Sequence, residues 1–582
     1  MNAPYNYKNN KESDSSMTHS KSGCLQYSLW ILVFLIYPGS IHSVSAQQKQ
    51  YTEHYLNLSF ESQTPANYPY GWYIEGDYAN STVQVTKTPM ALEGQHTVNV
   101  SVNGDEPTIL YTPLPASIGC IRNIELTVSS KGEGDVQASG FFIIPGQGFD
   151  LLEPKTVSQD WTKIKYTKST DGGCIKPSPL IGIYASGVGT AVFDDITIRI
   201  NGKAYASTPT PSFTIKKDTI DALNSIAHPV TERGISFPTH SNGMAKLLSR
   251  KIIALGENSH GAAELFAFKQ KLIATLIQGG ARTFALEIPA AAADRVNEYI
   301  SGLEVSRETM IGLLVYPAWQ TKEMLFIIDW LRRYNTTAEE KIAFAGFDVQ
   351  HPKIALEALG KRPLIASNSA FKTAYNDLIT SFQTGDAADT LKKIILMRDM
   401  LPLEAKYERR YLRLFRRGIL SDRQDLGGKS RDAYMADEVV ILAKETPSQV
   451  ILWADNTHVT KTDGGMGQFL SQTFGPDYVA VGFTFERGFY AAYGPKKRYA
   501  VELPFAGTHE AVLATANEKA YLIALNDVPH NHPLNARQSF RYIGSQPVKF
   551  NQFYPHILKD HFDIIGFVRQ TDATHYVIEH AF

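Results

Sequence analysis

Cysteine is scarce in this chain: only three of the 582 residues are cysteines, and all three lie in the first third. Cys24 comes before an apolar run near the start, and Cys120 and Cys174 follow in the next region. Because no cysteine lies beyond residue 174, a cysteine nucleophile is excluded from the rest of the chain. An oxidising compartment would permit a Cys120–Cys174 disulfide, although sequence alone leaves this pairing open.

Neither sign of charge predominates, with 57 Lys and Arg residues against 58 Asp and Glu residues. A chain with almost no net charge has no general electrostatic attraction for nucleic acid, so we expect no nucleic-acid partner. Hydrophobic residues make up 43% and aromatic residues 11% of the chain, which is typical of a folded globular protein. The length allows two or three domains and a large core.

Several signature motifs of enzymes are absent. The sequence contains no Gly-x-Ser-x-Gly nucleophile elbow, no His-Glu-x-x-His metal motif and no Gly-rich phosphate loop. Ser259 could be considered as a nucleophile, but it directly precedes His260, and neighbouring side chains on a turn seldom face each other. These absences favour direct attack by an activated water molecule.

The first residues are typical of an export signal. Three lysines precede an apolar run at 29–36, Pro38-Gly39 breaks the run, and Val44-Ser45-Ala46 offers small residues for cleavage. The run is shorter than the ~20 apolar residues that a bilayer span needs. We predict a signal peptide over residues 1–46 and a secreted or periplasmic protein without a stable membrane span. An uncleaved membrane anchor is the alternative.

Residues 47–203 are predicted to form an all-β domain. Short alternating runs such as 82–85, 96–102 and 136–144 are separated by Gly, Pro and Asn, and no segment shows a helical period. Evenly spaced short strands of this kind indicate a β-sandwich or jelly roll.

This predicted β domain resembles carbohydrate-binding jelly-roll modules in its closing run at 191–200 and in Asp160-Trp161-Thr162-Lys163. Trp72, Tyr70 and Tyr73 could therefore stack on a sugar ring and give the domain a glycan contact. Alternatively they pack in the core, which is the usual position of aromatic side chains in small sandwiches.

A predicted linker at 204–215 leads into residues 216–582, where strands alternate with helices. Apolar runs of strand length at 252–255 and 284–287 flank a segment with a helical apolar stripe at 262–278. This alternation predicts an α/β domain with a mainly parallel sheet, interrupted by a helical insertion at about 353–448.

Acidic residues and histidines lie at the ends of four predicted strands. In chain order they are Glu257 and His260 after 251–255, Glu287 at the end of 283–287, Asp348 after 342–347, and Asp455 and His458 after 450–454. In an open α/β sheet, ligands bind outside the carboxyl ends of the strands. Core packing does not require acids and histidines at the ends of four different strands. We therefore predict that these loops together form a single enzyme site.

His260 is the predicted general base, because a neutral imidazole can take a proton from water near neutral pH. Glu257, in the same loop, or Glu287, on the strand expected beside it, could accept the other ring N–H and fix the tautomer. His458 could stabilise an oxyanion or protonate a leaving alcohol. Each of these residues, taken alone, could have a purely structural role: the histidines could be incidental, and the glutamates could cap the helices that follow.

At these residues the chain resembles the erythromycin esterase family, from about Leu248 to the C-terminus. The resemblance rests on segments that occur in the family's order: 256–260 with 264–266, 284–287, Trp319 with Glu323 and 330–335, 346–348, 431–432 with 435–436, 452–459, and 482–483. It implies a metal-independent hydrolase without a cofactor that opens a macrolide lactone or another ester with a histidine-activated water, an activity that confers antibiotic resistance.

The resemblance also implies roles for individual residues. The predicted catalytic residues are Glu257, His260, Glu287 and His458, and the predicted substrate-binding residues are Lys269, Asp348, Arg431 and Asp455. Two positions depart from the family pattern: Asp455 stands where a histidine is usual, and Lys269 where an arginine is usual. Because Lys and Arg differ in their bidentate contacts, the substrate is left open to esters other than macrolides.

The sequence leaves two other functions open. The histidines and carboxylates together could hold a metal ion for a metal-dependent hydrolase, as in the distantly similar Tiki-type proteases. The chain could instead be a non-enzymatic glycan-binding protein that acts through its β domain. Sensitivity to a chelator tests the first, and an unchanged function after His260→Ala would support the second.

Overall fold

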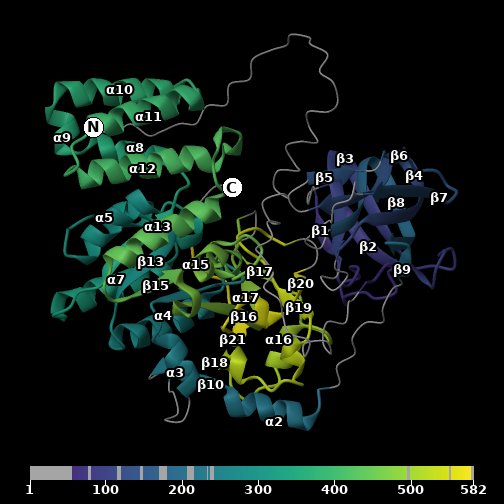
Figure 1. Ribbon diagram of the computed structural model, residues 1–582. Coiled ribbons are helices and arrows are strands. Elements are labelled where there is room, and N and C mark those ends of the chain that lie inside the picture. Colours follow the sequence, from purple (N-terminus) through teal and green to yellow (C-terminus); the bar gives the residue numbers. More distant parts are fainter. Residues whose placement is uncertain are drawn as a thin grey trace.

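The computed structural model describes residues 56–76, 80–114, 120–144, 148–151, 153–169, 180–205, 215–231, 234–235, 242–493, 498–548 and 552–577. The predicted signal peptide and residues 206–214 of the predicted linker lie outside this part. Figure 1 shows an all-β domain lying beside a larger domain of helices and strands. Among the described residues, no helix has the length and apolar character needed to cross a membrane.

Three long antiparallel strands dominate the β domain: β3 (His96–Pro113), β4 (Asn123–Ile144) and β8 (Leu180–Ile200), with β8 in the middle. The shorter strands join their edges: β1 (Tyr73–Glu75), β2 (Thr82–Lys87), β5 (Gly148–Leu151), β6 (Lys155–Thr156), β7 (Thr162–Ser169) and β9 (Lys203–Tyr205). The prediction of uniformly short strands was therefore wrong.

Glycines explain the long strands of the β domain. Gly134, Gly187 and Gly189 have φ values of 87°, 106° and 139°, and a Cβ atom on any of them would lie 2.1–2.4 Å from a carbonyl oxygen of the paired strand. Such glycines let two strands bend closely together without ending. The sequence pattern of interrupted runs thus reflects bends within β4 and β8 instead of turns between strands.

Trp72 lies inside the β domain, with 1% of its surface exposed, and its indole N–H donates to the backbone oxygen of Asn57 at 2.9 Å. It packs with Phe60 among the aliphatic side chains of the sandwich core. This geometry agrees with core packing and leaves Trp72 no face for a sugar. Cys120 is disulfide-bonded, and its predicted partner Cys174 lies outside the described residues.

The two neighbouring tyrosines contact the larger domain. The Tyr70 hydroxyl donates to the backbone oxygen of Gly507 at 2.9 Å. The Tyr73 ring is stacked between those of Tyr111 and Tyr554, with centroid distances of 5.1 and 4.7 Å and interplanar angles of 9° and 10°. Both side chains thus serve the contact between the domains, and glycan binding by this domain stays a prediction.

The sheet of the α/β domain has the order β11-β10-β18-β21-β16-β12-β15-β13-β14. Its strands are β10 (His228–Thr231), β11 (Gly234–Ile235), β12 (Ile252–Leu255), β13 (Ala281–Pro289), β14 (Ala343–Asp348), β15 (Gln449–Trp453), β16 (Tyr478–Tyr490), β18 (Ala520–Ala524) and β21 (Ile564–Thr571). The run from β21 to β14 is parallel, and β18, β10 and β11 form an antiparallel edge. All four residues of β12 are buried, as expected for a central strand covered on both faces.

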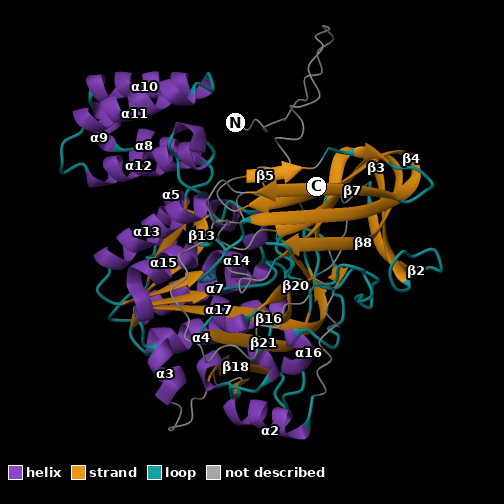
Figure 2. Ribbon diagram, turned by 45° about the vertical axis from the view of Figure 1, so that its right-hand side comes forward, coloured by secondary structure: helices purple, strands orange, loops and turns teal. Residues whose placement is uncertain are grey.

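Helices cover both faces of this sheet (Figure 2). The helices of this domain outside the insertion are α2 (Lys217–Ile226), α3 (Asn242–Leu248), α4 (Ala263–Gln278), α5 (Ala290–Ile300), α6 (Arg307–Leu313), α7 (Lys322–Thr337), α13 (Arg431–Glu445), α14 (Asn456–Val459), α15 (Met466–Phe474), α16 (His509–Leu513) and α17 (Leu558–His561). Two further short strand pairings involve β17 (Tyr499–Ala500) with β16, and β19 (Gln538–Arg541) with β20 (Phe553–His556).

The insertion forms a separate helical layer at the top of Figure 1. It comprises α8 (Pro352–Gly360), α9 (Pro363–Ser367), α10 (Ser369–Gln383), α11 (Ala387–Met400) and α12 (Lys406–Ser421), with an apolar core of its own. The predicted end of the insertion at about 448 was wrong, because α13 packs its apolar side chains into the core of the sheet. Its arginine-rich helix α12 is tied to the domain below by ion pairs, because Arg413 and Arg417 bind Glu438 on α13. This layer stands beside the ends of β13 and β14.

Candidate active site

The strand order brings four acidic side chains together at one edge of the sheet. Strands β12, β15, β13 and β14 are consecutive neighbours, and Glu257, Asp455, Glu287 and Asp348 lie at or just beyond their carboxyl ends. The expectation that the strand of Glu287 lies directly beside that of His260 was wrong, because β15 inserts between them. Asp455 consequently occupies the middle of the site.

The loop after β12 is held rigidly by its neighbours. A Cβ atom on Gly256 would lie 2.2 Å from Oδ1 of Asn456, so only glycine fits there. The backbone N–H of Asn456 donates to the backbone oxygen of Glu257 at 2.8 Å, which joins this loop to the loop after β15. Ser259 is fully buried, and its Oγ accepts from the Gly261 N–H at 3.2 Å, so this hydroxyl does not face the site.

Glu257 orients His260. Its Oε1 lies 2.6 Å from Nδ1 of His260, and its Oε2 accepts from Nζ of Lys269 at 2.6 Å and from the Trp453 indole at 2.7 Å. A carboxylate held by two other donors keeps its position, so Nδ1 of His260 carries the proton and Nε2 faces the site. The imidazole edge also packs against Trp319, with a centroid distance of 5.3 Å.

The acidic surroundings change the basicity of His260. Burial alone would lower its pKa, but the hydrogen bond to Glu257 and the charges of Glu257, Asp455 and Glu287 raise it to about 8. Burial also lowers the pKa of Lys269 to about 8 against the opposing charge of Glu257. At neutral pH most His260 side chains are therefore protonated, and the basic form increases as the pH rises towards 8.

His458 is held between two carboxylates. Its Nδ1 lies 2.7 Å from Oδ1 of Asp432, and its Nε2 lies 3.3 Å from Oε1 of Glu287. Burial opposes protonation, yet these two charges raise the pKa of His458 well above its usual value. The two carboxylates thus favour the protonated, cationic form of the ring and fix its orientation, and Nη1 of Arg431 also lies 3.3 Å from Nε2.

Arg431 connects the carboxylates on the other side of the site. Its guanidinium donates to both oxygens of Asp348, at 2.9 Å from Nε and 2.8 Å from Nη2, and from Nη2 to Glu287 at 2.8 Å. The hydroxyl of Tyr316 also donates to Asp348. Burial opposes ionisation of Glu287, but the charges of His458 and Arg431 hold its pKa far below the usual range.

Asp455 has one engaged and one unengaged oxygen. Its Oδ1 accepts from the N–H and the hydroxyl of Thr457, both at 2.8 Å. Its Oδ2 is buried without a hydrogen-bond partner and lies 3.8 Å from Nε2 of His260. Burial raises the pKa of Asp455. A buried carboxylate oxygen without a donor is costly, so a ligand or water molecule is expected at this point.

The site reaches the surface through its histidines. The side chains of His260 and His458 are 16% and 17% exposed, respectively. Next to Asp348 the surface forms a hollow lined by Pro289, Ala290, Ala291, Val349, Gln350, His351, Pro352, Ala355 and Leu414. Two of the four predicted substrate contacts, Lys269 and Asp348, have side chains with no exposed surface. They contact Glu257 and Arg431, respectively, and this differs from the position expected of a substrate contact.

Three further side chains belong to this cluster although no role was predicted for them: Asp432, Trp453 and Tyr316. Asp432 is in the first turn of α13, just after Ser430, whose side chain caps the helix. A Ser before an Arg-Asp pair is a detectable signal of a helix start, and it places Asp432 in the first turn. The contacts of Trp453 with Glu257 and of Tyr316 with Asp348 depend on tertiary structure alone.

The fold and the cluster together define an α/β protein with a buried acid–base site at the carboxyl end of its sheet. Comparison with known sequences identifies it further. The erythromycin esterase family profile matches residues 277–362 and 396–571. Erythromycin esterase type II of Escherichia coli is 30% identical over 305 residues, which cover 42% of this chain and 71% of that protein. The chain belongs to the erythromycin esterase family.

Solved structures share the fold. A succinoglycan biosynthesis protein matches 63% of this chain and 100% of its own, with a TM-score of 0.53 and 20% identity. A protein from Bacillus cereus matches 62% of this chain and 99% of its own, with a TM-score of 0.52 and 18% identity. At these identities the similarity concerns the fold alone. The family profile begins at residue 277, after the loop that carries Glu257 and His260.

Proposed function

We propose that this protein is an exported esterase that hydrolyses a lactone or another carboxylic ester with a water molecule activated by His260. The observation that carries the proposal is the pair formed by Nε2 of His260 and the unpartnered Oδ2 of Asp455, 3.8 Å apart. This separation is too long for a direct hydrogen bond, and a water molecule placed beside it reaches both atoms.

The first half of the reaction uses His260 as the base. Nε2 takes one proton from the water while Asp455 accepts a hydrogen bond from the other, and the water oxygen forms a bond to the ester carbonyl carbon. The carbonyl electron pair moves to its oxygen, which becomes the oxyanion of a tetrahedral intermediate. Glu257 keeps the imidazole oriented and stabilises the charge that it gains.

The second half of the reaction uses the cations across the site. The His458 imidazolium and the Arg431 guanidinium face Glu287 and provide positive charge for the oxyanion. When the carbonyl re-forms, the bond to the leaving alcohol oxygen breaks, and Nε2 of His260 returns its proton to that oxygen. The products are a carboxylic acid and an alcohol, with a net gain of one water.

The same contacts favour this mechanism over metal-dependent hydrolysis. Glu287 and Asp348, which would be the natural carboxylate ligands, are already neutralised by Arg431. His458 has both ring nitrogens next to carboxylates, so neither is free as a neutral donor. The half-buried guanidinium of Arg431 supplies the positive charge that a metal ion would otherwise provide.

The proposed substrate class rests on the family. Erythromycin esterase type II of Escherichia coli is named for its action on a macrolide. Export rests on the leader-like residues 1–46, and N-terminal sequencing of the protein from culture medium tests it.

The central test is hydrolysis of erythromycin and a panel of smaller esters and lactones, followed by mass spectrometry. We expect a gain of one water in the wild type and loss of this activity in His260→Asn. His575→Gln is the matched control, because it removes another imidazole paired with a carboxylate, on the protein surface. Equal turnover by wild type and His260→Asn would refute the mechanism, and abolition of turnover by a chelator would favour a metal.

A further inference from the structure

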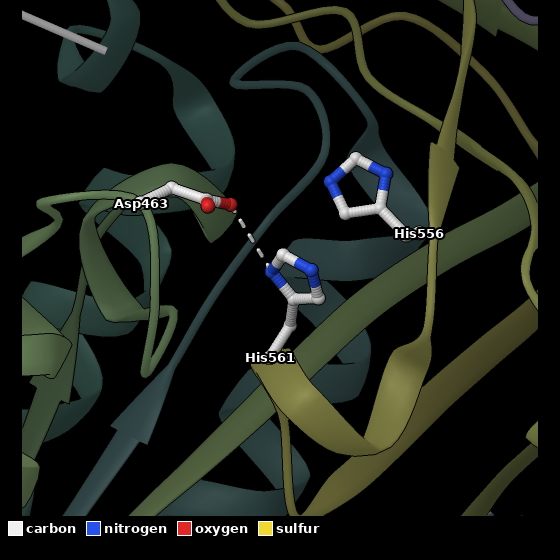
Figure 3. Close-up of side chains that lie close together, drawn as sticks. All are labelled: Asp463, His556 and His561. Carbon is white, nitrogen blue, oxygen red and sulfur yellow. Dashed lines mark ion pairs between the residues drawn. The ribbon is translucent and has the colours of Figure 1, made fainter. Parts of the chain in front are cut away.

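A second cluster of titratable side chains lies outside the active site. Asp463, in the loop between α14 and α15, faces His556 at the end of β20 and His561 at the end of α17 (Figure 3). One possible ligand atom from each residue lies within 4.8 Å of the other two. Within the described part of the chain, no other set of three His, Cys, Asp or Glu side chains meets this criterion.

The ring of His556 is oriented so that it could bind a metal ion. Its Nδ1 lies 2.9 Å from the backbone oxygen of Tyr554, so Nδ1 donates a proton there and Nε2 keeps its lone pair. Figure 3 shows the other ring nitrogen pointing towards Asp463. A histidine that binds a metal usually donates its second ring N–H to a carbonyl or carboxylate in this way.

His561 presents its Nδ1 to the same space. This nitrogen lies 3.4 Å from Oδ2 of Asp463, and the hydroxyls of Thr462 and Thr460 lie 2.8 and 3.0 Å from it. The imidazoles of His556 and His561 are adjacent, with a centroid distance of 4.5 Å.

We propose that Asp463, His556 and His561 bind one divalent transition-metal ion, with Zn²⁺ as the best match. Two imidazole nitrogens and one carboxylate oxygen are a typical zinc ligand set, and water can complete the tetrahedron. Ligand atoms about 2.1 Å from zinc lie roughly 3.4 Å apart in a tetrahedron, so binding draws the three groups together by about 1.4 Å at most. Asp463 is 59% exposed and supplies most of this movement.

The ion would be a structural clamp. Asp463 follows α14, the short helix that carries His458, whereas His556 and His561 belong to the C-terminal segment next to Tyr554. Tyr554 stacks on Tyr73 of the β domain. The metal therefore links the loop after His458 to the segment that contacts the β domain, without touching a residue of the active site.

Zinc binding to the chelator-stripped full-length protein tests this proposal directly. Titration with Zn²⁺, followed by equilibrium dialysis and elemental analysis, is expected to show one ion per chain. At about 100 times the dissociation constant, the ion is expected to raise the unfolding temperature by roughly 3–8 °C. Co²⁺ in the same site is expected to give the visible absorption of a tetrahedral complex.

Variants separate this site from the rest of the protein. Asp463→Asn, which changes an exposed side chain and leaves the core intact, and His556→Gln are expected to weaken Zn²⁺ binding at least tenfold. His260→Asn in the active site and His575→Gln on the surface are expected to bind like the wild type. Absence of a bound ion in the wild type at 100 µM Zn²⁺, or unchanged binding by both cluster variants, would overturn the proposal. Loss of the ion in His260→Asn alone would place it in the active site instead.

Discussion

The charge of Asp455 offers the sharpest check on the proposed base. Asp455→Asn keeps the size of the side chain and an oxygen for the donors on Thr457, so the loop should fold as before. The carboxylate lies 3.8 Å from Nε2 of His260. Coulomb's law gives about 1 kcal/mol at this distance with the dielectric constant of water and about 4 kcal/mol with a value of 20.

Because His260 reaches the surface, we take the lower part of that range, about 1.4 kcal/mol, which corresponds to one pKa unit. The substitution should therefore lower the pKa of His260 from about 8 to about 7. At pH 7 the neutral fraction of His260 would rise from about one tenth to about one half, or roughly fivefold.

Modification by diethyl pyrocarbonate measures this fraction without any substrate, because the reagent attacks neutral imidazole. The rate of modification at His260 would be followed by peptide mass spectrometry from pH 5.5 to 9. Each rate would be divided by the plateau rate at high pH, which removes differences in how easily the reagent reaches the ring. Asp477→Asn is the control, since it removes an exposed carboxylate at the amino end of β16. A midpoint that stays at about 8, or moves upward, in Asp455→Asn would refute the electrostatic account of His260.

Three other outcomes follow from the same contacts. Lys269→Met leaves the carboxylate of Glu257 buried without its cation and should cost about 3–5 kcal/mol in urea unfolding; a loss below 1 kcal/mol would show that this pair is not needed. His458→Gln should reduce kcat about 100- to 1000-fold with little change in KM, whereas a pure KM effect would assign it to substrate binding. Because the pKa of His260 is raised in the folded state, its contribution of roughly 2 kcal/mol is present below pH 6.5 and lost as the pH rises through 8. The stability of His260→Asn should therefore fall less than that of the wild type between pH 6 and 9, and parallel pH curves would contradict this.

The α/β domain could be predicted from the sequence because its buried parallel strands are short apolar runs that end in polar residues. The same signal pointed to Glu257, His260, Glu287, Asp348, Asp455 and His458, and the structure brings all six to one edge of the sheet. The order of the strands in the sheet could not be predicted from the sequence. Strand β15 comes from a segment almost two hundred residues after β12, and only tertiary packing places it between β12 and β13.

Lys269 and the β domain show two other limits of sequence reasoning. Lys269 was predicted to contact the substrate, and a lysine is normally exposed. It is buried instead because it pairs with Glu257, and local sequence patterns do not reveal this counter-charge. In the β domain, Gly134 and Gly187 resemble turn residues, although they sit within bent strands where two backbones approach closely. In both cases a long-range partner decides the outcome.

The stack of Tyr73 between Tyr111 and Tyr554 has a practical consequence for how this protein is handled. A truncated chain that begins after the β domain would leave the rings of Tyr554 and Phe505 open to water, since Phe505 now packs against Tyr70. Such a fragment would be prone to self-association, and the two halves would be expected to copurify after a proteolytic cut between them. The β domain is thus expected to stay attached to the α/β domain as a permanent part of the protein.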